Sequence, residues 1–180
     1  KHYPTNTLVT GFDIIFFWVA RMLMMSMYFM EDPPFKKVYV HALVRDEKGQ
    51  KMSKSKGNII DPLDLINNYG ADALRFTLAA MASQGRDIKL SKNRVEGYRN
   101  FATKLWNAVR FTEINECKLN ANYKPGNSKN TIILWITSEL VKMIEETTNS
   151  IESFKFNEAA EKVYQFTWHT FCDWYLEFIK

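Results

Sequence analysis

The feature that most constrains the fold is an apolar run at residues 14–30 that lies between two strand-like segments. The first segment, residues 7–10, is short and β-branched and ends at Gly11, and the second covers residues 37–44. A strand, a helix and a second strand within about 40 residues predict a βαβ unit with parallel neighbouring strands. We expect the first strand and the helix to be buried, with Asp13 capping the helix and Pro33 ending it.

The same apolar run imitates a membrane span in its composition. It holds five of the eight methionines of the chain, but it is 17 residues long, contains Arg21 and begins beside Asp13. A span needs roughly 20 residues with few charges. No basic region or cleavage pattern precedes it, which argues against a signal peptide. We therefore predict a buried amphipathic helix and no membrane partner, and a membrane-associated helical protein is the weakest alternative.

The rest of the chain predicts mostly helices. Asp61 and Pro62 begin a short helix, residues 71–82 form a second, residues 87–90 form a short strand, and Ser91 begins a long helix that ends near residue 115. After a polar linker at residues 118–128, two further helices at about 128–149 and 157–180 predict an antiparallel bundle. The apolar stripe expected on the long helix consists of Tyr98, Phe101, Leu105, Trp106, Val109 and Phe111 or Thr112.

Charge and cysteine content narrow the class of protein. Residues 1–126 carry 19 Lys and Arg against 12 Asp and Glu, whereas residues 127–180 carry 5 against 8. The basic excess therefore lies in the first two thirds of the chain, as expected of a surface that meets phosphates. Cys117 and Cys172 lie far apart without histidine or cysteine at ligand spacing, which argues against a zinc site and fits a reducing compartment.

A basic loop follows the second predicted strand. Residues 51–58 read Lys-Met-Ser-Lys-Ser-Lys-Gly-Asn, with three lysines within six residues and no apolar periodicity. Clustered ammonium groups, hydroxyls and free backbone N–H groups suit a polyphosphate. The alternative is a solvated basic turn.

The end of the first predicted strand has a second pattern that suits a nucleotide. Gly11 would let a ligand approach the backbone closely, and a carboxylate two residues on, Asp13, can accept both hydroxyls of a ribose. The alternative is that Asp13 is only a helix cap and Trp18 only core. In parallel sheets ligands bind beyond the carboxyl ends of the strands, so Gly11, Asp13, Val44 and the basic loop are expected at one rim.

These strings resemble a known enzyme family. Lys51-Met-Ser-Lys-Ser resembles the ATP-loop signature of class I aminoacyl-tRNA synthetases. Two further segments look like the valyl branch of this family: residues 38–46 and the string from Gly11, Gly-Phe-Asp-Ile-Ile-Phe-Phe-Trp-Val-Ala-Arg-Met. The isoleucyl branch has polar residues at the positions of Ile14 and Ile15. Residues 99–108 resemble the entry to the anticodon-binding domain of this group. The resemblance covers nearly all of residues 3–116.

The resemblance implies a function and a set of site residues. The parent enzyme would activate valine with ATP, accompanied by Mg²⁺, and transfer it to tRNA(Val). The implied catalytic residues are Lys54, which would contact the triphosphate, and Lys51, which would assist it; no protein residue is implied as a metal ligand. The implied ATP-binding residues are Gly11, Asp13, His41, Val44, Ser53, Lys54 and Ser55; the amino-acid pocket would be lined by Ile14 and Trp18; and tRNA would contact Lys92, Arg94, Arg99 and Lys104.

The resemblance also implies a fold that is α/β followed by all-α. Residues 1–47 would form the second half of a Rossmann-like catalytic domain, residues 48–90 a stem-contact module with the lysine loop, and residues 91–180 part of a helical anticodon-binding domain. The other family signature, His-x-Gly-His, is missing from the sequence. We therefore expect a fragment without activity of its own and without an editing domain, from a monomeric cytoplasmic parent.

Two alternatives stay open. One is a fragment of an isoleucyl-type synthetase, which would keep the fold and change the amino acid. The other is a non-catalytic helical RNA-binding module that retains only the loop.

Overall fold

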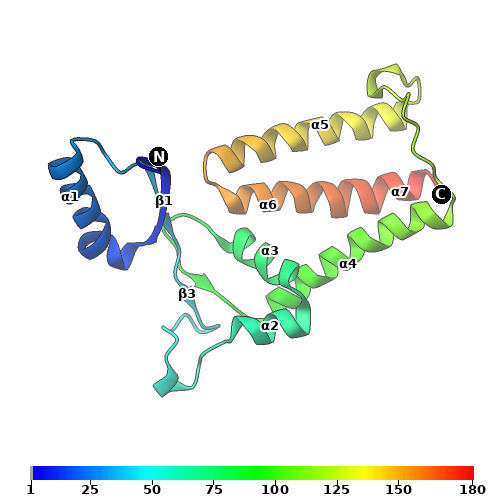
Figure 1. The fold of residues 1–180 in the computed structure, drawn as a ribbon. Coiled ribbons are helices and arrows are strands. Elements are labelled where there is room, and N and C mark those ends of the chain that lie inside the picture. The colour runs from blue at the N-terminus through cyan, green and yellow to red at the C-terminus, as the bar shows by residue number, and fades with distance from the viewer. Residues whose placement is uncertain (1) are drawn as a thin grey trace.

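The computed structural model describes residues 2–180, which form a βαβ unit, a middle part that carries the basic loop, and a group of long helices (Figure 1). Strands β1 (Thr5–Gly11) and β2 (Phe35–His41) are parallel neighbours, with Gly11 opposite His41. The connection consists of a 3-10 turn (Phe12–Ile14), a π-helical turn (Ile15–Val19) and helix α1 (Ala20–Met30). The predicted strand, helix and parallel strand are therefore confirmed. The prediction that Asp13 caps the helix is wrong, because Asp13 lies within the 3-10 turn and neither this turn nor α1 has a side-chain cap.

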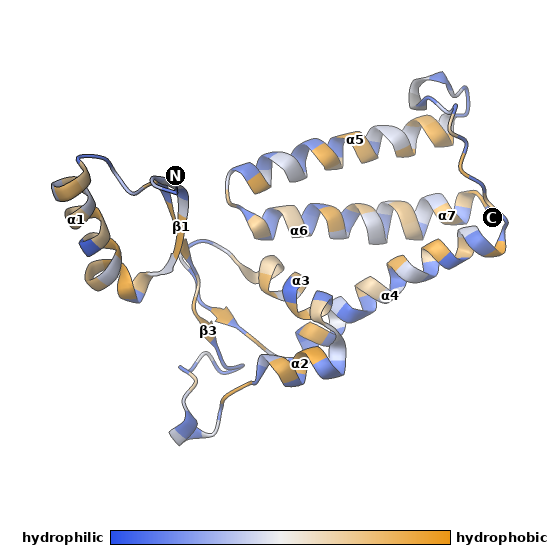
Figure 2. Ribbon diagram, viewed as in Figure 1, coloured by the Kyte–Doolittle hydropathy of each residue, from blue (hydrophilic) through white to orange (hydrophobic). Residues whose placement is uncertain are grey.

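The expected burial of this unit is wrong for the described residues. Val9 on β1 is 59% exposed and Tyr28 on α1 is 79% exposed, whereas Thr10, Gly11 and Val19 are buried. The reason is that a sheet of two strands offers α1 too little surface to cover its apolar side chains. Figure 2 shows α1 as a largely apolar helix set apart from the helical part of the molecule. By length and composition residues Phe12–Met30 would suffice to cross a membrane, a test that a core helix of a soluble protein also passes.

The middle part begins with a second small parallel sheet. The predicted strand 37–44 is interrupted at residues 42–43, and β3 (Val44–Arg45) pairs with β4 (Ile88–Lys89) instead of continuing β2. Between β3 and β4 lie the basic loop, α2 (Pro62–Tyr69) and α3 (Ala71–Met81). As predicted, Asp61 caps α2, because its side chain accepts a hydrogen bond from the backbone N–H of Leu63 at 2.8 Å.

A hydrophobic core holds the middle part to the start of the first long helix, α4 (Lys92–Ile114). Leu65 from α2, Leu74 from α3 and Val95 from α4 are buried together with Ala73 and Leu90. Burying such a side chain contributes roughly 1.5–3 kcal/mol relative to leaving it exposed. This core fixes the direction of α4 relative to the loop.

The last helices form an antiparallel hairpin beside α4 (Figure 1). Helix α5 (Thr131–Glu152) begins three residues beyond the linker that ends at Ser128, and Asn130 caps it by accepting from the backbone N–H groups of Ile132 and Ile133. The return path consists of α6 (Phe156–Tyr164), a π-helical stretch (Gln165–Tyr175) and α7 (Leu176–Phe178). The predicted pair of antiparallel helices is confirmed.

The predicted apolar stripe of α4 is only partly correct. Phe101 is buried and Phe111 is half-buried, but Leu105, Trp106 and Val109 are 46–66% exposed. Helix α3 and the π-helical stretch pack on a face that is rotated from the predicted one, so that Ala108 contacts Cys172 and Leu176. An α-helix with apolar residues over a wide arc has more than one possible contact face, and its partners select one.

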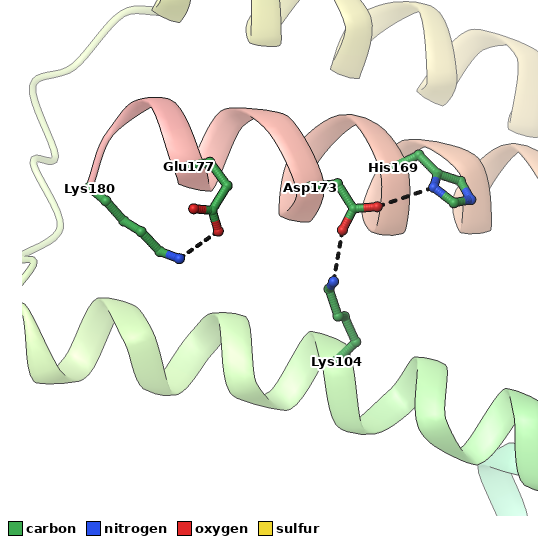
Figure 3. A network of polar contacts seen from close by, with 5 residues as sticks. All are labelled: Lys104, His169, Asp173, Glu177 and Lys180. Atoms are coloured by element: carbon green, nitrogen blue, oxygen red, sulfur yellow. Dashed lines mark hydrogen bonds and ion pairs between the residues drawn. The ribbon is translucent and has the colours of Figure 1, made fainter.

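Polar contacts join α4 to the returning helix (Figure 3). The ammonium group of Lys104 donates to Asp173 at 2.8 Å and lies 4.9 Å from the ring centroid of Trp168. The other carboxylate oxygen of Asp173 lies 3.2 Å from Nδ1 of His169. The hydrogen bond from Lys104 lowers the pKa of Asp173, and the same bond raises the pKa of Lys104. Both groups therefore stay charged at neutral pH.

Candidate nucleotide-binding site

The carboxyl ends of β1 and β2 bring together three residues that the sequence predicts for nucleotide binding. A Cβ atom at Gly11 would lie 2.5 Å from Oδ1 of Asp13 and 3.5 Å from Cε1 of His41. The carboxylate of Asp13 thus folds back over the backbone of Gly11, and a side chain at position 11 would displace it. Gly11 is buried, whereas Asp13 and His41 are both exposed, so the carboxylate and the imidazole are accessible from solvent.

The two residues predicted for the amino-acid pocket follow directly. Ile14 ends the 3-10 turn and is 41% exposed, and Trp18 lies in the π-helical turn and is 47% exposed. Ile14 and Trp18 are four positions apart, but they do not share one face of an α-helix, because α1 begins only at Ala20. A π-helical turn within a helix is often found at functional sites. Both side chains remain partly open to a ligand at the end of β1.

The basic loop is held by one side chain, that of Asn58. Its Nδ2 donates to Oδ2 of Asp46 at 2.8 Å and to the backbone carbonyl of Lys51 at 3.3 Å. Its Oδ1 accepts from the backbone N–H of Ser53 at 2.9 Å. Asp46 is held in turn, since its Oδ1 accepts from the backbone N–H of Gln50 at 2.6 Å. Asn58 thus ties the two ends of the loop to the turn that precedes it.

The reactive groups of the loop point to solvent. Residues 54–56 form a 3-10 turn closed by Gly57, whose φ of +63° lies in the left-handed region that favours glycine. The hydroxyls of Ser53 and Ser55 lie 3.2 Å apart. Lys51 and Lys54 are exposed, and neither forms an ion pair within residues 2–180. Two ammonium groups are therefore free to meet an anion.

The electrostatics of the loop depend on Asp46. The hydrogen bond from Asn58 is the main cause of a lowered pKa of Asp46. The carboxylate therefore stays ionised at neutral pH and remains an acceptor for Asn58. It lies in the turn rather than on the exposed segment of Lys54, so the loop presents positive charge outward.

The structure does not join the loop to the strand ends. Among the described residues no hydrogen bond or ion pair connects residues 51–58 with Gly11, Asp13 or His41. Val44, predicted beside the nucleotide, lies in β3 and is 40% exposed. The loop projects away from the helical hairpin and is the outermost part of the middle region (Figure 1).

The predicted tRNA-binding residues fall into two groups. Lys92, Arg94 and Arg99 are exposed on the first half of α4. Lys104 differs from the prediction, because its ammonium group is directed at Asp173 and Trp168 on the returning helix. Of the four residues predicted to contact tRNA, the first three are therefore exposed and without an ion pair among residues 2–180.

The sequence reasoning missed Asp46 and Asn58 as functional residues. Their side chains are 12 positions apart in the chain and meet only because the turn at residues 46–50 folds back on the loop. The signal that could have identified them is the Asp-Glu-Lys-Gly turn at residues 46–49 followed by a Gly-Asn pair at the end of the basic string. No group of three or more His, Cys, Asp or Glu residues with the arrangement of a metal site occurs in the described chain.

Comparison with known proteins identifies two regions. The model of class I tRNA synthetases (I, L, M and V) matches residues 1–91, and the model of the anticodon-binding domain of tRNA ligases matches residues 134–180. The chain is 66% identical over 180 residues to a valine–tRNA ligase of Rhodopseudomonas palustris and 63% identical to one of Bradyrhizobium diazoefficiens. Each match covers 100% of this chain and 19% of the relative, so the chain spans about a fifth of the length of these proteins.

Solved structures show the same fold at lower identity. A LeuRS of Agrobacterium radiobacter K84, in a ternary complex with tRNA and LeuAMS, superposes with a TM-score of 0.78 at 22% identity, over 91% of this chain and 22% of that one. A methionyl-tRNA synthetase of Mycobacterium tuberculosis in complex with methionyl-adenylate gives 0.76 at 23% identity, over 93% and 33%. The α/β part and the helical part thus occur together, in this arrangement, in other proteins.

Proposed function

Because the chain belongs to the class I tRNA synthetases of the isoleucine, leucine, methionine and valine group, we propose that it forms part of a valine–tRNA ligase. The whole enzyme activates valine with ATP and transfers the valyl group to tRNA(Val). The observation that carries the proposal is the meeting of Gly11, Asp13 and His41 at the carboxyl ends of two parallel strands. The choice of valine rests on the similarity to valine–tRNA ligases along the whole chain.

In this proposal the strand ends hold the adenosine. The carboxylate of Asp13 accepts hydrogen bonds from the ribose hydroxyls, and the missing side chain of Gly11 lets the sugar lie against the backbone. Backbone groups near His41 and Val44 lie against adenine. Ile14 and Trp18, which follow on the same connection and are partly exposed, line the pocket for the valine side chain.

The loop acts on the phosphates. The valine carboxylate attacks the α-phosphorus, the bond to the β-phosphate oxygen breaks, and pyrophosphate leaves with the bonding electrons. Negative charge increases on the phosphoryl and pyrophosphate oxygens, and the ammonium groups of Lys54 and Lys51 stabilise it. The hydroxyls of Ser53 and Ser55 and the backbone N–H groups of the loop donate hydrogen bonds to the phosphate oxygens. Losing one such charged contact costs on the order of 3 kcal/mol in the barrier.

The loop must move for this chemistry. Its exposed lysines have no contact with the strand ends among the described residues, so ATP would have to draw it across the site. Mobile loops that close over a substrate in this way are common in enzymes. Mg²⁺ would arrive with ATP and be held by the phosphate oxygens, because the described chain offers no cluster of acidic side chains for it.

The proposal also assigns a role to each part of the chain. Residues 1–47 would belong to the second half of a Rossmann-like catalytic domain, residues 48–90 to a stem-contact module, and residues 91–180 to an anticodon-binding domain. The tRNA would lie along α4, near Lys92, Arg94 and Arg99. A full-length enzyme would be cytoplasmic and monomeric.

The experiment that tests the proposal is ATP–pyrophosphate exchange by a full-length synthetase that carries these residues, with valine, isoleucine, leucine and threonine compared. We expect strong exchange with valine and weaker exchange with threonine, because an apolar pocket rejects an isosteric hydroxyl poorly; valyl enzymes are known to discriminate by about a hundredfold. Exchange led by isoleucine would instead assign the isoleucyl branch. No exchange with any of the four would favour a non-catalytic RNA-binding module.

A further inference from the structure

A cavity outside the candidate nucleotide-binding site is lined by residues of α3, α4 and α6. It is open to solvent and has a volume of about 510 Å³. Aromatic rings form one of its walls: the ring centroids of Phe76 and Tyr98 are 5.1 Å apart, and those of Tyr98 and Tyr164 are 6.2 Å apart. The rest of the lining comes from α4 and α6, and α6 lies within the region that the anticodon-binding family model matches.

Polar side chains line this cavity without using their hydrogen-bonding groups. Asn157, Glu161 and Gln165 recur every four residues along α6 and its continuation, and Arg94 lies across from them on α4. None of these four side chains forms a hydrogen bond or an ion pair to another residue between 2 and 180. Burial raises the pKa of Tyr98, so its hydroxyl remains a protonated donor beside them.

The cavity wall includes a glycine that neither the backbone conformation nor the packing of the described residues requires. Gly97 lies within α4, where glycine weakens a helix relative to alanine. Its backbone is not in the left-handed region, and a Cβ atom built on it meets no heavy atom within 4 Å. Neither a turn nor a close packing contact therefore requires glycine here. Its effect is to leave the backbone of α4 open toward the cavity.

These features define the chemistry of a ligand. Aromatic side chains stack on planar rings, two amides and a carboxylate match the donors and acceptors of a base edge, and an arginine suits a phosphate. Lys92 and Arg99 on the same helix extend the positive surface for a backbone. We propose that the cavity between α3, α4 and α6 receives an unstacked base of a tRNA, with Arg94 on an adjoining phosphate. This inference rests on the proposed function, since it needs a tRNA as partner.

Filling the cavity tests the proposal in a full-length synthetase that carries these residues. The variant Gly97→Met places a side chain in the cavity and removes a helix-weakening glycine. Ala102→Met is the matched control, because it adds the same side chain at an exposed position of α4 outside the cavity. We expect Gly97→Met to raise the Kd for a tRNA(Val) transcript at least tenfold and to lower charging relative to ATP–pyrophosphate exchange by a similar factor. The control should stay within twofold.

A second variant addresses the phosphate. Arg94→Ala should weaken binding and reduce the slope of log K against log salt by about 1. Equal Kd values for the two methionine variants would overturn the cavity proposal. A lower melting temperature of Gly97→Met, with charging and exchange reduced together, would also overturn it by showing that a segment of the longer polypeptide fills the cavity. The proposed function fails separately, if the unsubstituted enzyme shows no exchange.

Discussion

Replacing Asn58 by alanine should disorder the basic loop while leaving the fold intact. The change removes three hydrogen bonds, to Asp46, to the carbonyl of Lys51 and from the N–H of Ser53. A typical hydrogen bond contributes about 1 kcal/mol net, and partial exposure of this side chain reduces the value of each. We therefore expect the ordered loop to lose about 1.5 kcal/mol, which corresponds to roughly a tenfold fall in the ratio of ordered to disordered loop.

The assay is ATP–pyrophosphate exchange with valine by a full-length synthetase. Because the loop presents Lys51 and Lys54, kcat/KM for ATP should fall about tenfold in Asn58→Ala, whereas KM for valine should hardly change. The melting temperature should also stay close to that of the unsubstituted enzyme, since the loop lies outside the core of Leu65, Leu74 and Val95.

Two further variants make the test specific. Asn67→Ala on α2 is the matched control, because Asn67 is exposed and makes no side-chain hydrogen bond within residues 2–180. Asn58→Asp should be worse than Asn58→Ala, since it places a second carboxylate against that of Asp46. The reasoning is refuted if Asn58→Ala and Asn67→Ala exchange pyrophosphate at the same rate.

The remaining predictions concern the strand ends, the loop lysines and the helical bundle. Lys54→Ala should lower exchange at least a hundredfold with Lys56→Ala as the milder control, and equal rates for the two would remove Lys54 from the proposed chemistry. Asp13→Ala should raise KM for ATP about tenfold in the same assay, and an effect on valine alone would contradict the ribose contact. Trp18→Ala should reduce the preference for valine over smaller amino acids, measured as a ratio of exchange rates; an unchanged ratio would leave Trp18 a packing residue. The pKa values of Asp173 and Glu146 are lowered, so their ion pairs stabilise the bundle above the unfolded pKa of these acids, and this contribution is lost as pH falls below about 4. The melting temperature should therefore be constant between pH 5 and 8. A decline already at pH 6 would argue against these pairs.

Sequence patterns predicted those parts of the fold that depend on nearby residues. The parallel pairing of β1 and β2 follows from a strand, an apolar helix and a strand in close succession, and it brings Gly11 opposite His41, whereas Val44, expected at the same rim, lies in the second sheet. The start of α2 follows from Asp61 and Pro62: the side chain of Asp61 accepts a hydrogen bond from a backbone N–H at the helix end, and Pro62 has no N–H that needs a partner. In both cases the determining residues belong to the same short stretch of chain as the structure that they specify.

Features that depend on distant partners were not predictable in this way. The contact face of α4 was misjudged because Leu105, Trp106 and Val109 look as apolar as Phe101 and Phe111, and only α3 and the returning helix select between the two faces. The sequence predicted that Lys104 contacts RNA, because its partner Asp173 lies 69 positions later in the chain and only the fold brings the two together. The role of Asn58 required the fold of the preceding turn.

The exposure of α1 bears on the membrane alternative. A folded soluble domain rarely leaves a continuous apolar surface as large as that of Phe12–Met30 uncovered, so such a surface requires a partner, either lipid or protein. Lipid fits poorly, because Arg21 lies exposed within the segment and Asp13 stands at its start, and a charge inside a span costs a few kcal/mol. Protein fits better, since the segment directly follows the end of β1, beside Gly11 and Asp13, which we propose to hold the nucleotide. The chain spans about a fifth of its relatives, and we propose that the first half of the nucleotide-binding fold covers the apolar surface of α1 in a full-length synthetase.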